Sequence, residues 1–80
     1  MEGVVKWFRA KIGYGFLVSD DVVDAEGQPQ DIFAHYTKIQ MEGFKKLEAG
    51  EKVSFDLVMN DAGRPQAENI IRLEVHNNAE

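Results

Sequence analysis

The chain has 80 residues, a formal net charge of −5 and no cysteine. A domain of this size buries only about 60% of the surface of its unfolded chain, so we expect marginal stability, with neither a disulfide nor a Cys/His zinc site to add to it. No apolar run approaches the ~18 residues that span a membrane, and charged residues interrupt the first twenty positions. We therefore expect a cytoplasmic protein without a signal peptide or a membrane partner.

The sequence reads as five short strands separated by turn signals, over residues 4–8, 13–18, 31–36, 51–59 and 66–75. A polar loop spans residues 19–31, and an irregular segment spans 37–50, with room for one short helical turn after His35. Three strands in a meander followed by a hairpin predict an all-β fold that closes into a small barrel, because closure removes exposed sheet edges. We assign residues 1–75 to one domain and 76–80 to a frayed tail.

Aromatic residues alternate with small ones in the second expected strand, which reads IGYGFLV. Side chains alternate between the two faces of a strand, so Tyr14 and Phe16 share one face and Gly13 and Gly15 share the other. Glycine inside a strand often marks a bend or a close approach of another backbone.

The third expected strand, DIFAHY, has the same pattern, with Phe33 and His35 on one face. If the second and third strands pair antiparallel, the rings of both strands form one cluster through cross-strand neighbours. The rings could simply be core, but aliphatic residues on the opposite faces and on the other strands already supply one. That expected core is Val5, Ile32, Ala34, Ile39, Leu47, Val53, Phe55, Leu57 and either Ile70 or Ile71.

Rings mixed with His, Lys and Arg are typical of proteins that bind single-stranded nucleic acid. Bases stack on such rings at ~1–3 kcal/mol each while cations follow the backbone. The alternative is a protein-interaction barrel that uses the aromatic face or an edge strand to hold a peptide or a second subunit. An enzyme is not expected, because His35 and His76 are the only histidines and no catalytic motif occurs. We accordingly expect no cofactor, no metal and no small-molecule substrate.

The segments VKWF, GYGFLV, DIFAHY and GFKKLEAGEKVSFDL resemble the bacterial cold shock proteins, from Gly3 to about Ile71. The resemblance implies a five-stranded antiparallel oligonucleotide-binding (OB-fold) barrel. It also implies binding of single-stranded RNA or DNA with low sequence selectivity, as an RNA chaperone or a modulator of transcription or replication. DIFAHY and the residues after it are similar to the D-type branch, which adds a homodimer as an option.

Carried over position by position, the resemblance places stacking rings, backbone-binding cations and one base-binding carboxylate on this sequence. Gln40 and Gln66 are further polar candidates or plain surface. The implied nucleic-acid-binding residues are Lys6, Trp7, Phe8, Arg9, Lys11, Tyr14, Phe16, Asp31, Phe33, His35, Tyr36, Phe44 and Lys45.

Three departures from the family pattern bear on that site. Ile12 stands where the family has lysine, and Lys11 comes one place earlier. Because side chains alternate along a strand, a shift of one residue could move the charge to the wrong face. Arg9 replaces the usual asparagine and can supply a cation and a stacking plane. The segment before Asp31 is longer than in short family members and acidic. It is either a solvated loop or a neighbour of the binding face that repels phosphate.

Overall fold

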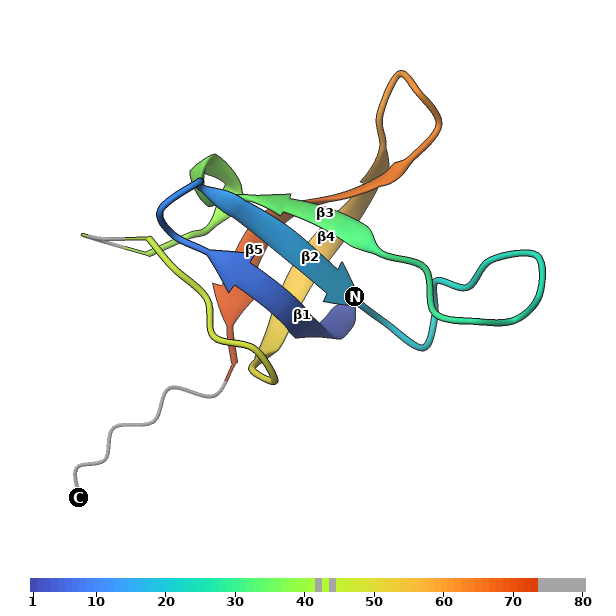
Figure 1. Cartoon of the computed structure of the whole chain (residues 1–80), viewed down its shortest axis with the longest axis horizontal. Coiled ribbons are helices and arrows are strands. Elements are labelled where there is room, and N and C mark those ends of the chain that lie inside the picture. The colour runs from blue at the N-terminus through green and yellow to red at the C-terminus, as the bar shows by residue number, and fades with distance from the viewer. Residues whose placement is uncertain (42, 44, 74–80) are drawn as a thin grey trace.

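The computed structural model describes residues 1–41, 43 and 45–73 (Figure 1). Its elements are β1 (Glu2–Arg9), β2 (Tyr14–Val18), β3 (Ile32–His35), the short 3-10 helix η1 (Tyr36–Lys38), β4 (Lys52–Met59) and β5 (Pro65–Arg72). The five expected strands and the helical turn after His35 are confirmed. The expected tail, and the last two residues of the expected fifth strand, lie outside the described residues. No helix in the described part is long and apolar enough to cross a membrane.

The strands form a closed barrel in the order β1-β2-β3-β5-β4. The expectation of antiparallel pairing holds for β1 with β2, β2 with β3, β1 with β4 and β4 with β5. The expected five-stranded barrel is confirmed, with one parallel pair, β3 with β5, at its closure. The reason for the parallel pair is the route of the chain: after β3 it crosses to β4, and the β4–β5 hairpin brings it back in the direction of β3.

Aliphatic side chains fill the barrel, with Phe55 as the one buried aromatic residue among the described positions. Of the expected core, Ile70 is fully buried whereas Ile71 is 48% exposed, and Leu57 is only partly buried. Three members of the core were not expected, namely Leu17, Val22 and Ala67. The remaining expected residues all belong to the core, and among the described residues no aromatic ring other than that of Phe55 is buried in it.

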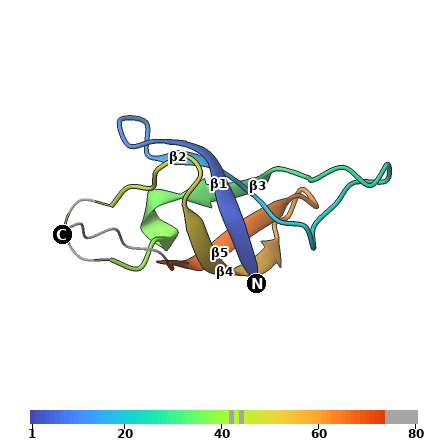
Figure 2. The same cartoon turned by 90° about the horizontal axis from the view of Figure 1, so that it is seen from below.

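The acidic segment between β2 and β3 is a structured excursion and extends beyond the end of the barrel (Figure 2). Isolated bridges join Ser19 to Val22 and Val23 to Pro29. Buried Ser19 fixes the base of the loop, because its Oγ donates to the carbonyl oxygen of Glu2 at 2.8 Å and accepts from the N–H of Asp21 at 3.2 Å. The loop therefore keeps a defined position next to the sheet.

Candidate nucleic-acid interface

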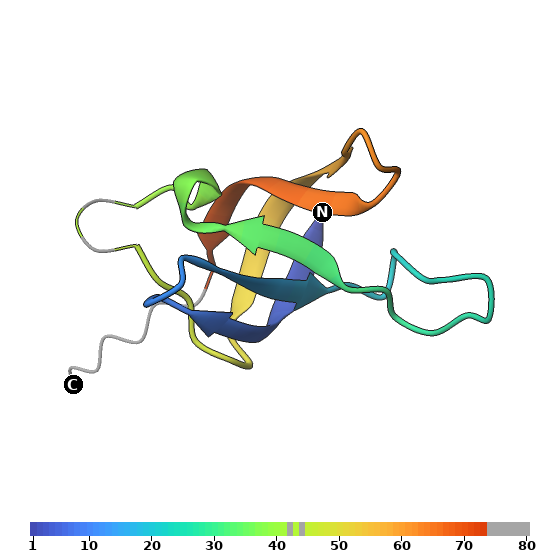
Figure 3. The same cartoon turned by 45° about the horizontal axis from the view of Figure 1, so that its top comes forward.

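β1, β2 and β3 lie side by side in the barrel (Figure 3). Five rings from these strands, those of Trp7, Tyr14, Phe16, Phe33 and His35, form one cluster. Tyr14 pairs with His35 and Phe16 with Phe33 across β2 and β3, while Trp7 of β1 pairs with Phe16. All five are partly exposed. We call this set the aromatic face.

The rings of the aromatic face are in mutual contact at distances suited to separate bases. Ring centroids lie 5.3 Å apart for Trp7 and Phe16, 5.6 Å for Tyr14 and Phe33, and 5.8 Å for Phe16 and Phe33. The centroid of His35 is 6.2 Å from that of Phe33. These spacings exceed the ~3.4 Å rise between stacked bases in a duplex strand. Bases stacked on neighbouring rings would thus be separated from one another.

An irregularity in β1 decides which of its two aromatic residues joins the face. The pairing of β1 with β2 shifts between Val5 and Trp7, so Lys6 is an extra residue. Trp7 consequently pairs with outward-facing Phe16, whereas Phe8 pairs with inward-facing Gly15. Phe8 packs partly buried against the core. Phe8, expected among the stacking rings, therefore lies on the opposite side of the sheet from them.

Gly15 is required where β1 and β2 come closest. A Cβ atom at Gly15 would overlap the carbonyl oxygen of Trp7 and lie 2.5 Å from the Cα atom of Phe8. The β1 backbone thus approaches β2 closely at the irregularity that turns Trp7 outward. Gly13 serves another purpose, because it has φ +82° in the turn before β2, a conformation that glycine adopts without strain.

His35 also caps the helix that follows it. Its Nδ1 accepts the backbone N–H of Thr37 at 3.3 Å and lies 2.9 Å from the Thr37 hydroxyl. Because Nδ1 is an acceptor, the neutral ring carries its proton on Nε2, which is then its donor. Tyr36 is 46% exposed, with its ring centroid 4.8 Å from that of His35, so it extends the aromatic face along η1.

Several cations gather at the end of the face where β1 turns into β2. The guanidinium carbon of Arg9 lies 5.7 Å from the centroid of the Trp7 ring, a cation–π geometry. Lys11 and Lys45 line a hollow of about 430 Å³ together with Ile12 and Tyr36. Residues 10–13 form a turn, so strand alternation does not decide on which face Lys11 lies.

Two further lysines are paired with carboxylates. Lys6 Nζ lies 2.9 Å from Asp31 Oδ1, so two of the expected binding residues contact each other. Lys46 Nζ lies 2.9 Å from Glu48 Oε2, and its hydrogen bond lowers the pKa of that carboxyl group. Phe44, the remaining ring of the expected site, lies outside the described residues.

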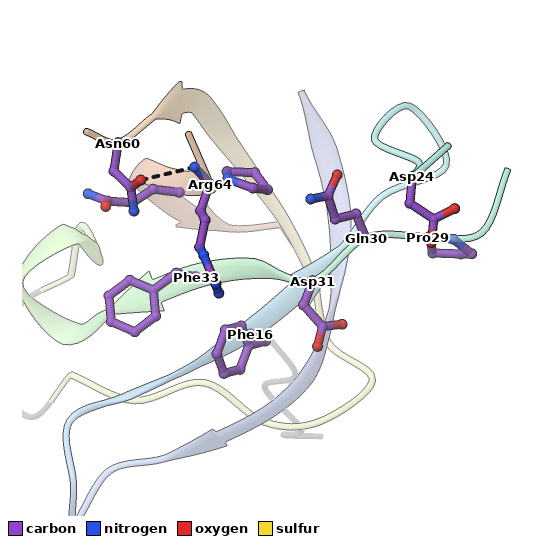
Figure 4. Close-up of a pocket in the computed structure, with 10 residues that line it drawn as sticks. Phe16, Asp24, Pro29, Gln30, Asp31, Phe33, Asn60 and Arg64 are labelled. Atoms are coloured by element: carbon purple, nitrogen blue, oxygen red, sulfur yellow. Dashed lines mark hydrogen bonds between the residues drawn. The ribbon is translucent and has the colours of Figure 1, made fainter. Parts of the chain in front are cut away.

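A groove of about 760 Å³ continues the face past Phe16 and Phe33, between the β2–β3 loop and the β4–β5 turn (Figure 4). Sequence reasoning missed its main cation, Arg64, because only the barrel topology brings the β4–β5 turn beside β3. Gln66, a weak candidate from the sequence, pairs with Phe33 and lines the groove, whereas Gln40 contacts Asn69 elsewhere. The lining residues are Phe16, Asp24, Pro29, Gln30, Asp31, Phe33, Asn60, Arg64, Pro65 and Gln66.

A closed five-stranded barrel with rings on the outside of three neighbouring strands and cations at one end defines a class of small β-barrel binding domains. Comparison with known families identifies which family of such barrels this is, because residues 1–73 match the 'Cold-shock' DNA-binding domain. The chain belongs to this family, whose members bind nucleic acid, and the match indicates no enzymatic family.

Individual relatives cover almost the whole chain. It is 48% identical over 71 residues to cold shock protein CspB of Geobacillus stearothermophilus, which is 89% of this chain and 96% of the relative. It is 42% identical over 73 residues to cold shock-like protein CspC of Bacillus cereus, 91% of this chain and 100% of the relative. It is 43% identical over 72 residues to cold shock protein CspA of Staphylococcus epidermidis, which is 90% of this chain and 97% of the relative. Placement in the D-type branch stays a prediction.

Proposed function

We propose that this protein binds single-stranded RNA or DNA by stacking bases on the aromatic face, with Arg9, Lys11 and Lys45 near the backbone at one end. Binding of extended strands in preference to duplexes would make it an RNA chaperone or a modulator of processes that expose single-stranded DNA.

The observation that supports this proposal most is the continuity of partly exposed rings from Trp7 through Phe16 and Phe33 to His35, at centroid separations of 5.3 to 6.2 Å. A core function does not account for these rings, since the aliphatic residues already fill the barrel. Stacking also suits a protein with a net charge of −5, because rings attract bases whatever the charge of the whole domain.

Fluorescence of Trp7 during titration with oligo(dT) and with a matched RNA, each at two salt concentrations, tests the proposal. Trp7 is the only tryptophan, so the signal reports on the aromatic face alone. We expect strong quenching by both oligomers and a shallow salt dependence, because few phosphates are neutralised. A duplex of the same sequence is the control and should quench weakly.

A folded sample whose Trp7 fluorescence neither oligomer changes would contradict the proposal. That result would favour the alternative, in which the same exposed rings hold a peptide or a second subunit. Sedimentation without ligand would then distinguish self-association from binding of another protein.

A further inference from the structure

The groove beyond Phe16 and Phe33, called here the end groove, shares both rings with the aromatic face. A strand stacked on that face therefore brings its next nucleotide to the end groove. Its opposite flanks are the β2–β3 loop, with Gln30 and Asp31, and the β4–β5 turn, with Arg64 (Figure 4).

The charges around the end groove favour a base over a phosphate. Asp24 and Asp31 line it, and three more acids, Asp20, Asp21 and Glu26, lie in the same loop. Asp24 is held in place, because its Oδ1 accepts the N–H groups of Glu26 at 2.9 Å and Gln28 at 3.0 Å. Carboxylates so placed repel the phosphates of an approaching strand but not a neutral base.

Arg64 is presented to the end groove by a well-defined turn. Asn60 Oδ1 accepts the N–H groups of Ala62 at 2.9 Å and of Arg64 at 3.0 Å, and the N–H of Asn60 donates to the carbonyl of Arg64 at 2.9 Å. Figure 4 shows the Arg64 side chain extending from this turn toward Phe33 and Phe16. These hydrogen bonds fix the backbone from which the exposed Arg64 side chain extends. A guanidinium group can give two parallel hydrogen bonds to one base edge.

We propose that the end groove reads one nucleobase of the bound strand through Arg64 and prefers guanine. This inference rests on the proposed function. Guanine offers two adjacent acceptors, O6 and N7, to a guanidinium fork, and an amino group to a carboxylate on a different edge. Arg64 and Asp31, on the two flanks, supply that complementary pair, and the Asp31 carboxylate would accept from the base as well as from Lys6. Adenine presents an amino group beside N7, where it would face the donors of Arg64.

The test uses a short oligo(dT) in which one position at a time carries guanine, adenine or cytosine, and measures affinity by Trp7 quenching. In the wild type, guanine at one position should raise affinity by at least about fivefold, the lower bound for a bidentate contact to a base. Arg64→Lys keeps the charge but loses the fork, and should bring the guanine-to-thymine ratio close to one. Arg9→Lys is the matched control and should keep the ratio.

The ratio within each variant cancels any general change in affinity, and circular dichroism checks that the variants fold. A ratio close to one at every position in the wild type, or a ratio that survives Arg64→Lys, would overturn the inference while leaving the proposed function standing. A preference of similar size for another base would overturn the assignment of guanine. Failure of oligo(dT) itself to quench Trp7 would instead count against the proposed function, and this inference would fall with it.

Discussion

Asp31 Oδ1 accepts a hydrogen bond from Lys6 Nζ at 2.9 Å. Lys6 is the extra residue at the irregularity of β1, and Asp31 directly precedes β3. Both side chains are about half exposed. A phosphate that reaches Lys6 must therefore compete with a carboxylate of the protein itself. The pair keeps Lys6 partly neutralised in the free protein.

Asp31→Asn should strengthen binding of oligo(dT) by up to about fivefold at low salt, the equivalent of the ~1 kcal/mol upper range for an exposed ion pair. The salt dependence should become steeper, because Lys6 would then neutralise a phosphate. Glu48→Gln, which removes the partner of Lys46 elsewhere on the surface, is the matched control. Weaker binding of oligo(dT) by Asp31→Asn would show that the carboxylate contacts the strand more than it restrains Lys6.

Phe33→Ala should weaken binding of oligo(dT) by roughly 1–3 kcal/mol, because one stacking surface is lost. Phe33 is a suitable choice because the rings that contact Trp7 are Tyr14 and Phe16, so the fluorescent reporter keeps its surroundings. Val58→Ala, at an exposed site on β4, is the control. Denaturant unfolding of both variants separates lost binding from lost stability, and unchanged affinity of folded Phe33→Ala would contradict stacking at this ring.

Gly15→Ala should destabilise the fold by at least about 2 kcal/mol, because the added methyl group meets backbone atoms of Trp7 and Phe8 that cannot move without shifting β1. Gly27→Ala is a useful comparison, since that glycine has φ +83° and open space around it. The loss of stability in Gly27→Ala should stay near ~1 kcal/mol, the cost of placing a residue with a side chain in the left-handed conformation. Thermal and denaturant unfolding measure both, and equal stability of the two variants would refute the close approach of β1 to β2.

Neutralising the β2–β3 loop should raise affinity for oligo(dT) at low salt. We suggest the combined variant Asp20→Asn, Asp21→Asn and Glu26→Gln, whose side chains are exposed. Deleting residues 20–27 would be a poorer test, because it removes Val22 from the core. The gain should vanish near 1 M salt, where the screening length falls to ~3 Å. A gain that persists at high salt, or no gain at all, would mean that the loop charges do not act on the strand.

The alternation of residues along single strands predicted much of this molecule. It placed Phe16 and Phe33 outside and Ile32 and Ala34 inside, because a period of two needs no knowledge of the partner strand. It could not separate Trp7 from Phe8, since the extra residue at Lys6 exists only in the register with β2. Arg64 and Val22 were missed for a related reason: their surroundings come from chain segments distant in sequence.

The close approach of β1 to β2 at Gly15, beneath the aromatic face, also bears on the entropy of binding. Three paired strands fix the backbone beneath the aromatic face, and contacts between neighbouring rings restrict their side chains before a ligand arrives. A free single strand, in contrast, samples many backbone conformations. Most of the ordering cost then falls on the nucleic acid, and strands that are already extended would bind at the lowest entropic cost.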